Sequence, residues 1–207
     1  MTNATLYVEE PCRQEGRAMK LILFGGVHGV GKTTLLDHVD EALGGDAQIF
    51  DPGVYFWKHL HEAKDKTTAE IEEMIIRDLL AVKETELVIC NWHYAVWTES
   101  GYVPQLGYSN LKRLTAAMAP EAIVLIWVTA SAEDVYARRV SDASRRKRKI
   151  DMRCIHEEIA ATDRELKNHL EALRGHADVR LVLLDNTDLE SAKNLLVKIL
   201  GAEMHGK

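Results

Sequence analysis

The feature that most constrains the fold of this chain is the ten-residue stretch GGVHGVGKTT at residues 25–34. Gly26 to Thr33 match the full pattern G-x-x-x-x-G-K-[ST], between an apolar run at 20–25 and an amphipathic stretch at 33–43. A glycine-rich turn between a buried strand and a helix lets successive backbone N–H groups converge on phosphate oxygens. The sequence therefore predicts a loop that binds a nucleoside triphosphate at the start of the first helix.

Each part of this loop has an expected role. The residues expected to wrap the phosphates of the nucleotide are Gly25, Gly26, Val27, His28, Gly29, Val30, Gly31, Lys32, Thr33 and Thr34. Lys32 is a catalytic candidate because it brings a mobile positive charge to the β- and γ-phosphates, and the Thr33 hydroxyl is a candidate ligand of Mg²⁺. The motif indicates nucleotide binding without naming a reaction, since switches, motors and kinases share it.

The rest of the chain alternates short apolar strands with amphipathic helices. Further strands are predicted at 47–50, 87–90, 122–128 and 179–184. Helices are predicted at 33–43, 69–83, 110–118, 131–140, 155–173 and 189–200. Apolar runs of this kind indicate strands buried on both faces, which is typical of parallel sheets. We therefore predict the α/β fold of P-loop NTPases, a three-layer sandwich with a five-stranded parallel sheet, helices on both faces and a short lid.

Composition limits what this chain of 207 residues can be. We expect one P-loop domain over 19–207, preceded by a polar and flexible N-terminal extension at 1–18. No apolar run reaches the roughly 20 residues of a bilayer span, and a formal net charge of −6 disfavours non-specific binding to nucleic acid. From the span and the charge we expect neither membrane nor nucleic-acid partners. The three cysteines are widely separated, which predicts reduced thiols and a cytoplasmic protein.

Three segments in fixed order resemble the archaeal-type adenylate kinases. They are GGVHGVGKTT at 25–34, NWHYAVWTESGYVPQL at 91–106 and APEAIVLIWVTASAEDVYARRVSDASRR at 119–146. The resemblance implies an ATP-dependent phosphotransferase that acts on AMP or a related nucleoside monophosphate, with ATP and Mg²⁺ as cofactors. It places His93 at the family's histidine. The family forms oligomers, so a homo-oligomer is a further expectation.

The resemblance also directs attention to a basic segment in an otherwise acidic chain. Residues 145–149 are five consecutive basic residues, and they follow a predicted helix that ends near Arg138. Phosphoryl transfer requires positive charge around the transferring group in a site that water can leave. We therefore take Arg138, Arg145 and Arg148 as catalytic candidates and residues 141–152 as the lid. The alternative interpretation of the segment is a solvated basic turn.

The chain departs from the family pattern at one position that is expected to bind the metal. Asn91 stands where the family has an aspartate, whose carboxylate at the end of the third strand orients the hydration shell of Mg²⁺. Asn91 can accept a hydrogen bond from a metal-bound water but brings no charge. We keep Asn91, with Thr33, as a metal-site candidate. A nucleotide-binding sensor without turnover is an alternative function that this departure motivates.

Asp51 follows the second predicted strand directly, at the edge where ligands bind in open α/β sheets. A hydroxyl acceptor benefits from a carboxylate that takes its proton, as in small-molecule P-loop kinases resembling shikimate kinase. Asp-Pro-Gly is also a common turn sequence, so both interpretations stay open. Asp51 is thus the catalytic base candidate of an alternative function, a kinase of a small hydroxyl substrate.

Aromatic residues concentrate in two segments near the expected acceptor side. They are Tyr55, Phe56, Trp57, Trp92, Tyr94 and Trp97. Stacking on a nucleobase is one use of such residues, and packing in the core is the other. We expect core packing for at least half of them.

Overall fold

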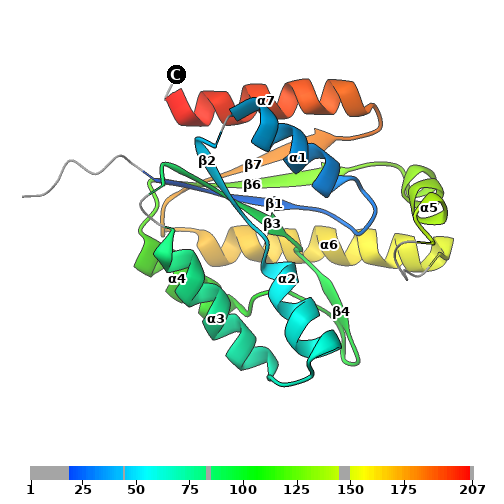
Figure 1. The fold of residues 1–207 in the computed structure, drawn as a ribbon, viewed down its shortest axis with the longest axis horizontal. Helices are drawn as coiled ribbons and strands as arrows, with labels where there is room; N and C mark the ends of the chain where they lie inside the picture. The colour runs from blue at the N-terminus through cyan, green and yellow to red at the C-terminus, as the bar shows by residue number, and fades with distance from the viewer. Residues whose placement is uncertain (1–18, 44, 83–84, 145–149, 206–207) are drawn as a thin grey trace, which may run out of the picture.

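A parallel sheet of five strands forms the centre of the computed structural model, which describes residues 19–43, 45–82, 85–144 and 150–205 (Figure 1). The strand order is β2–β3–β1–β6–β7. The strands are β1 (Lys20–Gly25), β2 (Ala47–Phe50), β3 (Leu87–Trp92), β6 (Ala122–Thr129) and β7 (Asp178–Asp185). β1 lies in the middle, with Lys20 aligned to Leu87 on one side and to Ala122 on the other. The predicted five-stranded parallel sheet is confirmed.

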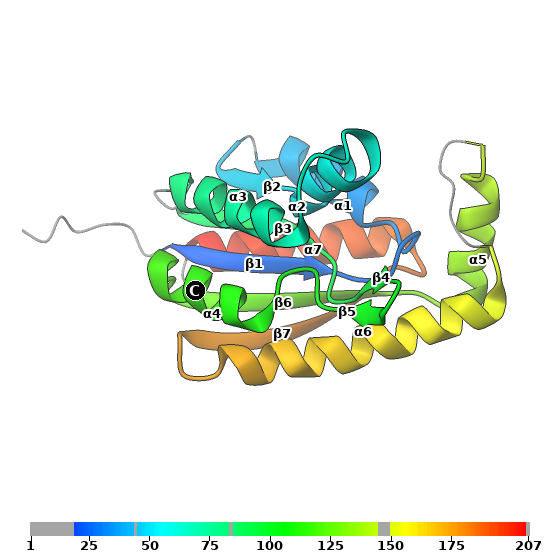
Figure 2. The same cartoon turned by 90° about the horizontal axis from the view of Figure 1, so that it is seen from below.

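Helices cover both faces of this sheet (Figures 1 and 2). The first layer holds α1 (Lys32–Leu43) and α7 (Leu189–His205), and the second holds α3 (Thr68–Ala81), α4 (Tyr108–Met118) and α6 (Met152–Leu173). Leu21 and Leu23 pack with the second layer, whereas Ile22 and Phe24 pack with the first. Alternate residues of one apolar strand therefore fill two cores, which makes the three-layer sandwich.

The ends of the helices near the C-terminal edge of the sheet are set by polar caps. α5 (Ala132–Ser141) lies beyond the C-terminal ends of the strands and starts at Ser131, whose side chain accepts a hydrogen bond from the Asp134 N–H (Figure 1). α6 starts in the same way, because the Asp151 side chain accepts from the Cys154 N–H. Each such cap stabilises its helix by about 1 kcal/mol. The predicted start at Ser131 is confirmed, and the long helix begins earlier than predicted.

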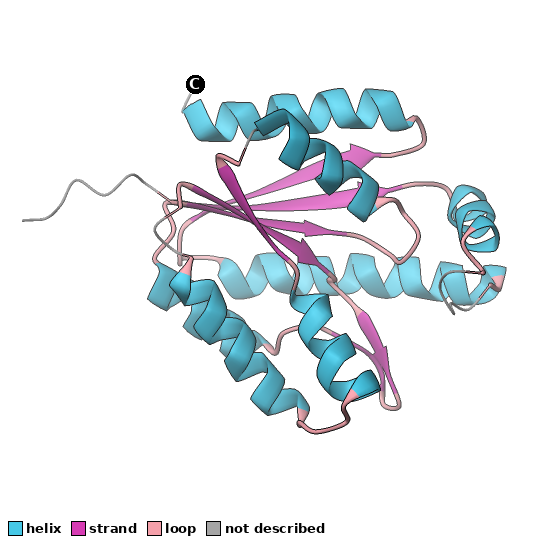
Figure 3. Cartoon of the chain, viewed as in Figure 1, coloured by secondary structure: helices cyan, strands magenta, loops and turns pink. Residues whose placement is uncertain are grey.

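Four short elements without a predicted counterpart lie beyond the ends of β2 and β3 (Figure 3). α2 (Pro52–Phe56) runs into η1 (Trp57–Glu62), a stretch of π-helix. β4 (Val96–Thr98) and β5 (Gly101–Val103) form a separate antiparallel pair. Each element has three to six residues, which is too short for a hydrophobic period to develop.

The prediction that all strands are buried on both faces is wrong for the two edge strands, since no residue of β2 is buried and most of β7 is exposed. Leu181 is 42% exposed and Leu183 is 61% exposed. β7 stands at the edge of the sheet beside β6, so fewer neighbours cover its side chains. The apolar run at 179–184 therefore predicted the strand correctly but not its exposure.

Two expectations fall on residues outside the described part of the chain. They are the N-terminal extension at 1–18 and the basic segment that contains Arg145 and Arg148, which leaves the predicted lid at 141–152 described only in part. Among the described residues, no helix combines the length and the apolar composition that a membrane crossing requires.

Candidate active site

The loop that joins β1 to α1 forms the centre of the site. Residues 25–34, which include the last residue of β1 and the start of α1, are called the donor loop from here on. Gly29 has φ of 79° and Gly31 has φ of 100°, in the left-handed region that glycine adopts without strain. A Cβ atom on Gly31 would also lie 2.4 Å from the Asn186 side chain. α1 begins at Lys32, so the positive end of its dipole lies at the loop. The local geometry is therefore that of an anion-binding loop.

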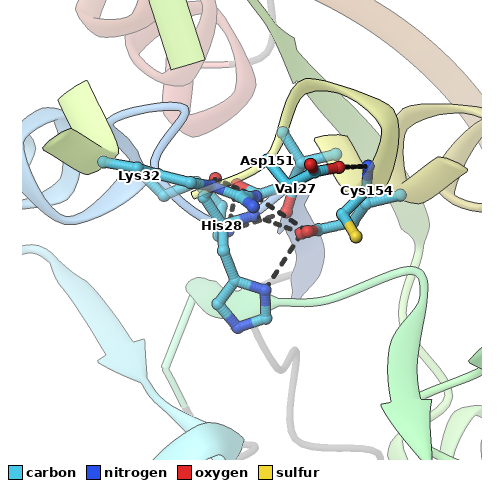
Figure 4. A network of polar contacts seen from close by, with 8 residues as sticks. Val27, His28, Lys32, Asp151 and Cys154 are labelled. Atoms are coloured by element: carbon cyan, nitrogen blue, oxygen red, sulfur yellow. Dashed lines mark hydrogen bonds and ion pairs between the residues drawn. The ribbon is translucent and has the colours of Figure 1, made fainter. Parts of the chain in front are cut away.

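Lys32 folds back across the donor loop (Figure 4). Its Nζ donates hydrogen bonds to the carbonyl oxygens of Gly26 at 2.8 Å and of Val27 at 3.4 Å. The residue is only 7% exposed. Phosphate oxygens are stronger partners for an ammonium group than neutral carbonyls are, because both sides of the bond are then charged. Lys32 is thus held close to the position that the motif predicts for a phosphate-binding lysine.

A buried ion pair supports the donor loop from the side of α5 and α6. Arg139 is 2% exposed, and its Nε and Nη2 donate to the His28 carbonyl at 3.1 and 2.8 Å. Its Nη2 also donates to Glu158 Oε2 at 2.7 Å. Glu158 Oε1 in turn accepts from the His28 backbone N–H at 2.7 Å and lies 3.0 Å from His28 Nδ1 (Figure 4). Both charges are therefore paired and hydrogen-bonded, as buried charges must be to be stable.

Glu158 is ionised at neutral pH. Burial by itself raises the pKa of this carboxyl group, but the hydrogen bonds and charge of His28 and the charge of Arg139 outweigh burial and lower the pKa to about 2. A carboxylate, rather than a neutral acid, therefore accepts the His28 backbone N–H.

Arg138 lies against the donor loop, at the helix end where the sequence placed it. Its Nη1 donates to the Val30 carbonyl at 2.8 Å and its Nη2 to the Asn186 carbonyl at 2.6 Å. The Asn186 side chain donates to the same Val30 oxygen at 2.7 Å. In this arrangement Arg138 holds the backbone of the loop, and contact with a phosphate requires it to exchange these carbonyls. Sequence reasoning missed Asn186, which lies two residues beyond the predicted strand at 179–184 and directly after the observed β7.

Asp51 and Asn91 form a pair at the C-terminal ends of β2 and β3, below called the acceptor edge. Asn91 Nδ2 donates to Asp51 Oδ2 at 2.8 Å, and the Gly53 N–H donates to Asp51 Oδ1 at 2.8 Å. Asp51 therefore caps α2 and also presents an oriented carboxylate, so the turn role and a chemical role are compatible. Asn91 Oδ1 is buried and has no hydrogen-bond partner among the described residues. The structure joins two candidates that the sequence treated separately.

The residues near the donor loop fit a magnesium ion that arrives with a nucleotide. The described residues contain no group of three or more His, Cys, Asp and Glu side chains that could hold a metal by themselves. Mg²⁺ in nucleotide sites keeps several waters and uses one or two protein oxygens plus phosphates. Thr33 is exposed at the start of α1, and Asn91 Oδ1 is an acceptor with no hydrogen-bond partner in the described chain. Both are oxygen donors of the required kind.

A stacked pair of histidines joins the donor loop to the segment that follows β3. The rings of His28 and His93 have centroids 4.3 Å apart and an interplanar angle of 21°. His93 is itself positioned by Gln105, whose Oε1 accepts the His93 backbone N–H at 2.8 Å. Gln105 is 4% exposed. Sequence reasoning missed the stack and Gln105, because their contacts depend on the fold.

Most of the aromatic residues near the acceptor edge belong to the core. Trp92 and Tyr94 are fully buried, and Tyr55 and Phe56 pack against the same cluster. This confirms core packing for at least half of the six. The other two differ, since Trp57 and Trp97 are 60% and 57% exposed.

A buried histidine lies among these core rings. His169 accepts a hydrogen bond from Trp92 Nε1 at 3.2 Å and donates from Nδ1 to the Glu165 carbonyl at 2.7 Å. The rings of Tyr94 and Tyr108 lie nearly perpendicular to the His169 ring, at centroid distances of 5.4 and 5.3 Å. Burial lowers the pKa of His169 to about 4. His169 is therefore neutral at physiological pH and supports the acceptor edge from below as a core residue.

Comparison of the sequence with known proteins identifies one full-length relative of modest identity. An adenylate kinase of Methanothermobacter thermautotrophicus is 28% identical, and the match covers 88% of this chain and 100% of that protein. No protein-family model matches the sequence. The match supports a nucleotide kinase and does not distinguish the archaeal-type subfamily.

Solved structures show the fold. The YorR protein of Bacillus subtilis, in complex with phosphorylated GDP, has a TM-score of 0.60 at 14% identity, covering 89% of this chain and 98% of that one. A shikimate kinase of Bacteroides thetaiotaomicron has a TM-score of 0.50 at 18% identity, covering 89% and 99%. The fold is that of the P-loop kinases, and at these identities the structural likeness extends to the fold alone.

Proposed function

We propose that this chain is an ATP-dependent kinase that transfers the γ-phosphate of ATP to AMP or a related nucleoside monophosphate. The observation that carries the proposal is the donor loop, with Lys32 buried over it, at the C-terminal edge of a P-loop kinase sheet. The similarity to an adenylate kinase over 88% of the chain supports the choice of acceptor.

The donor loop binds and orients ATP. On binding, Lys32 exchanges the carbonyls of Gly26 and Val27 for oxygens of the β- and γ-phosphates. Thr33 and, through a bound water, Asn91 would hold the Mg²⁺ ion that arrives with the nucleotide. Bound Mg²⁺ supplies positive charge that offsets the charge of the β- and γ-phosphates. Arg138 adds charge from the end of α5 where it releases its loop carbonyls.

A monophosphate acceptor needs positioning more than it needs a base. Its phosphate oxygen is already an anionic nucleophile, so catalysis depends on alignment with the donor and on the exclusion of water. In this proposal the lid at 141–152 closes over both nucleotides and brings Arg145 and Arg148 to the transferring group. The single protein domain at 19–207 then contains the whole reaction.

The acceptor edge favours one second candidate, a kinase of a small hydroxyl substrate. Asp51 lies at the end of β2 with one carboxylate oxygen held by Asn91 at 2.8 Å. A carboxylate oriented in this way suits the removal of a hydroxyl proton during transfer. Asp51 is then the general base, with the same donor loop and Lys32.

An acceptor panel tests these proposals directly. ATP and Mg²⁺ are incubated with AMP, CMP, GMP and UMP, and separately with shikimate and simple sugars, while ADP formation is followed in a coupled assay. We expect turnover with at least one monophosphate at a rate on the order of 1–100 s⁻¹, as for other kinases. Transfer to a hydroxyl compound alone supports the second candidate. Tight ATP binding with no transfer to any acceptor refutes both and supports a sensor.

A further inference from the structure

The His28–His93 stack lies where the donor loop meets the acceptor edge. We propose that His28 is a further substrate-contacting residue, whose protonated ring binds the phosphate of the acceptor beside the donor loop. The inference rests on the proposed function, since it assigns a contact to the acceptor of that reaction.

The orientation of the His28 ring is fixed by α6. Glu158 Oε1 accepts from the His28 backbone N–H at 2.7 Å and lies 3.0 Å from Nδ1. The partner of one ring nitrogen decides where the proton of an imidazole resides, so Nδ1 is the protonated nitrogen. Glu158 is in turn held by Arg139, which is almost fully buried. The ring therefore stands on a rigid support that stabilises its charged form.

The ring is also the accessible part of this network. The His28 side chain is 43% exposed, whereas that of Glu158 is 11% exposed and that of Arg139 is 2% exposed. Figure 4 shows the ring projecting away from the donor loop and from Lys32. It projects toward the segment after β3, where it stacks on His93 at 4.3 Å. A ligand at the acceptor edge can thus reach His28 while ATP occupies the loop.

The carboxylate of Glu158 beside the ring would stabilise a proton on His28. Glu158 faces it from α6, and Arg139 of α5 donates to the His28 carbonyl. Lys32 belongs to the same loop and points back to Gly26. The His93 ring faces it at stacking distance, which disfavours charge on both rings together. A cation on the ring beside the carboxylate suits a phosphate acceptor and gives no advantage to an uncharged hydroxyl acceptor.

Binding measurements on three variants test the proposal. His28→Gln keeps a donor for Glu158 but removes the charge, His28→Lys keeps a charge, and His176→Gln changes an exposed histidine in the turn after α6. AMP binding and the binding of a non-hydrolysable ATP analogue are measured separately by calorimetry. We expect His28→Gln to weaken AMP binding about tenfold or more, the value of one hydrogen bond to a charged group. The ATP analogue should bind within about twofold of wild type, and His28→Lys should recover most of the loss.

The pH dependence adds a readout that a structural role would not change. The AMP affinity of the wild type should fall as rising pH deprotonates the His28 ring, while the AMP phosphate stays a dianion. The affinity of His28→Gln and of His28→Lys should stay flat over the same range. In NMR spectra, the His28 C2 proton should titrate at higher pH when AMP is present.

The outcomes separate this inference from the proposed function. Equal weakening of AMP and ATP-analogue binding in His28→Gln would mean that His28 only holds the loop, and unchanged AMP binding would also overturn the inference. In either case wild-type transfer to AMP leaves the proposed function standing. A wild type that shifts the His28 resonance with AMP but transfers no phosphate refutes the function alone. A wild type that binds none of the four monophosphates of the acceptor panel refutes both.

Discussion

The two sides of the site differ in the groups that hold their charged side chains. On the donor side, Lys32, Arg139 and Glu158 are buried and hydrogen-bonded to the loop or to each other. On the acceptor edge, Asp51 accepts hydrogen bonds from the neutral Asn91 amide and from the Gly53 N–H. Each side also has a buried amide oxygen without a hydrogen-bond partner in the described chain, Asn186 Oδ1 beside the donor loop and Asn91 Oδ1 at the acceptor edge. The donor loop is therefore supported by a buried ion pair, whereas Asp51 is held by uncharged donors.

This difference matches what each side must recognise. A triphosphate is bound through backbone N–H groups, which is effective only when the loop geometry is fixed in advance. In the proposed function, the acceptor would be selected by side chains on the short elements beside the acceptor edge, α2, η1 and the β4–β5 pair, on which Trp57 and Trp97 are exposed. Variation at the acceptor edge can change the substrate without disturbing the donor loop.

The largest effect is expected from breaking the buried pair on the donor side. Arg139→Met removes the buried cation that pairs with Glu158, which keeps only its contacts with His28, and removes two hydrogen bonds to the His28 carbonyl. We expect a loss of about 3–5 kcal/mol in the free energy of unfolding, measured by urea denaturation. Arg153→Met is the matched control, because the Arg153 side chain is 88% exposed in its pair with Glu157, and it should cost about 0.5 kcal/mol or less.

The double variant Arg139→Met with Glu158→Met completes this test. It removes both charges, so it should be more stable than Arg139→Met alone. A loss below about 1 kcal/mol for Arg139→Met would show that the donor side is no better anchored than an exposed surface pair.

The second expected effect concerns chemistry on the same side. Lys32→Met removes the charge that contacts Gly26 and Val27 while keeping most of the side-chain volume. We expect kcat to fall by about 10²–10³-fold, as for the loss of one transition-state donor, with the fold unchanged by circular dichroism. Lys167→Met, at a residue 69% exposed on α6, is the control and should keep wild-type kcat. A decrease below tenfold for Lys32→Met would contradict the assigned role.

The separation along the chain between contacting residues explains what the sequence could and could not predict. The donor loop, the strands and the cap at Ser131 are encoded by neighbouring residues, so a pattern is sufficient to identify them. The bond between His28 and Glu158 joins residues 130 positions apart and has no local signal. The same holds for Asn186 and Val30, which are 156 positions apart. α2, η1 and the β4–β5 pair escaped because they are too short to show a period.

Lowering the pH should destabilise the two sides of the site in different pH ranges. The pKa of His169 is about 4 in the folded protein and 6.5 ordinarily, so its contribution is complete above pH 6.5 and is lost as pH falls toward 4. The pKa of Glu158 is about 2 in the fold against 4.5 ordinarily, so its contribution is lost only below about pH 4.5.

Between pH 7.5 and pH 5, the loss should therefore come from the core beneath the acceptor edge. We expect the free energy of unfolding to fall by about 2 kcal/mol over this range in urea titrations. His169→Gln should be less stable at pH 7.5, because it disturbs the bond to Trp92, but should lose much less between the two pH values. An equal loss in both proteins would place the acid sensitivity elsewhere.

The smallest effect is expected at the acceptor edge itself. Asp51 accepts from Gly53 and from Asn91 with different oxygens, and an amide has only one oxygen to offer. Asp51→Asn should therefore cost about 1 kcal/mol of stability, as for a weakened helix cap. Transfer to a monophosphate should change by less than about fivefold, since that acceptor needs no base, whereas a hydroxyl acceptor should lose about 10²–10⁴-fold.

Exchanging the two partners distinguishes a base from a structural pair. The double variant Asp51→Asn with Asn91→Asp keeps one carboxylate and one amide in contact but moves the charge from the end of β2 to the end of β3. If Asp51 serves only to hold the pair and cap α2, the exchange should restore transfer to a hydroxyl acceptor to within about twofold of wild type. The reason is that the amide oxygen still accepts from Gly53. Transfer to a hydroxyl acceptor that stays low in the exchanged protein, while its stability recovers, would mean that the carboxylate must be at the end of β2. The acceptor edge would then perform chemistry of its own, and the second candidate function would replace the first.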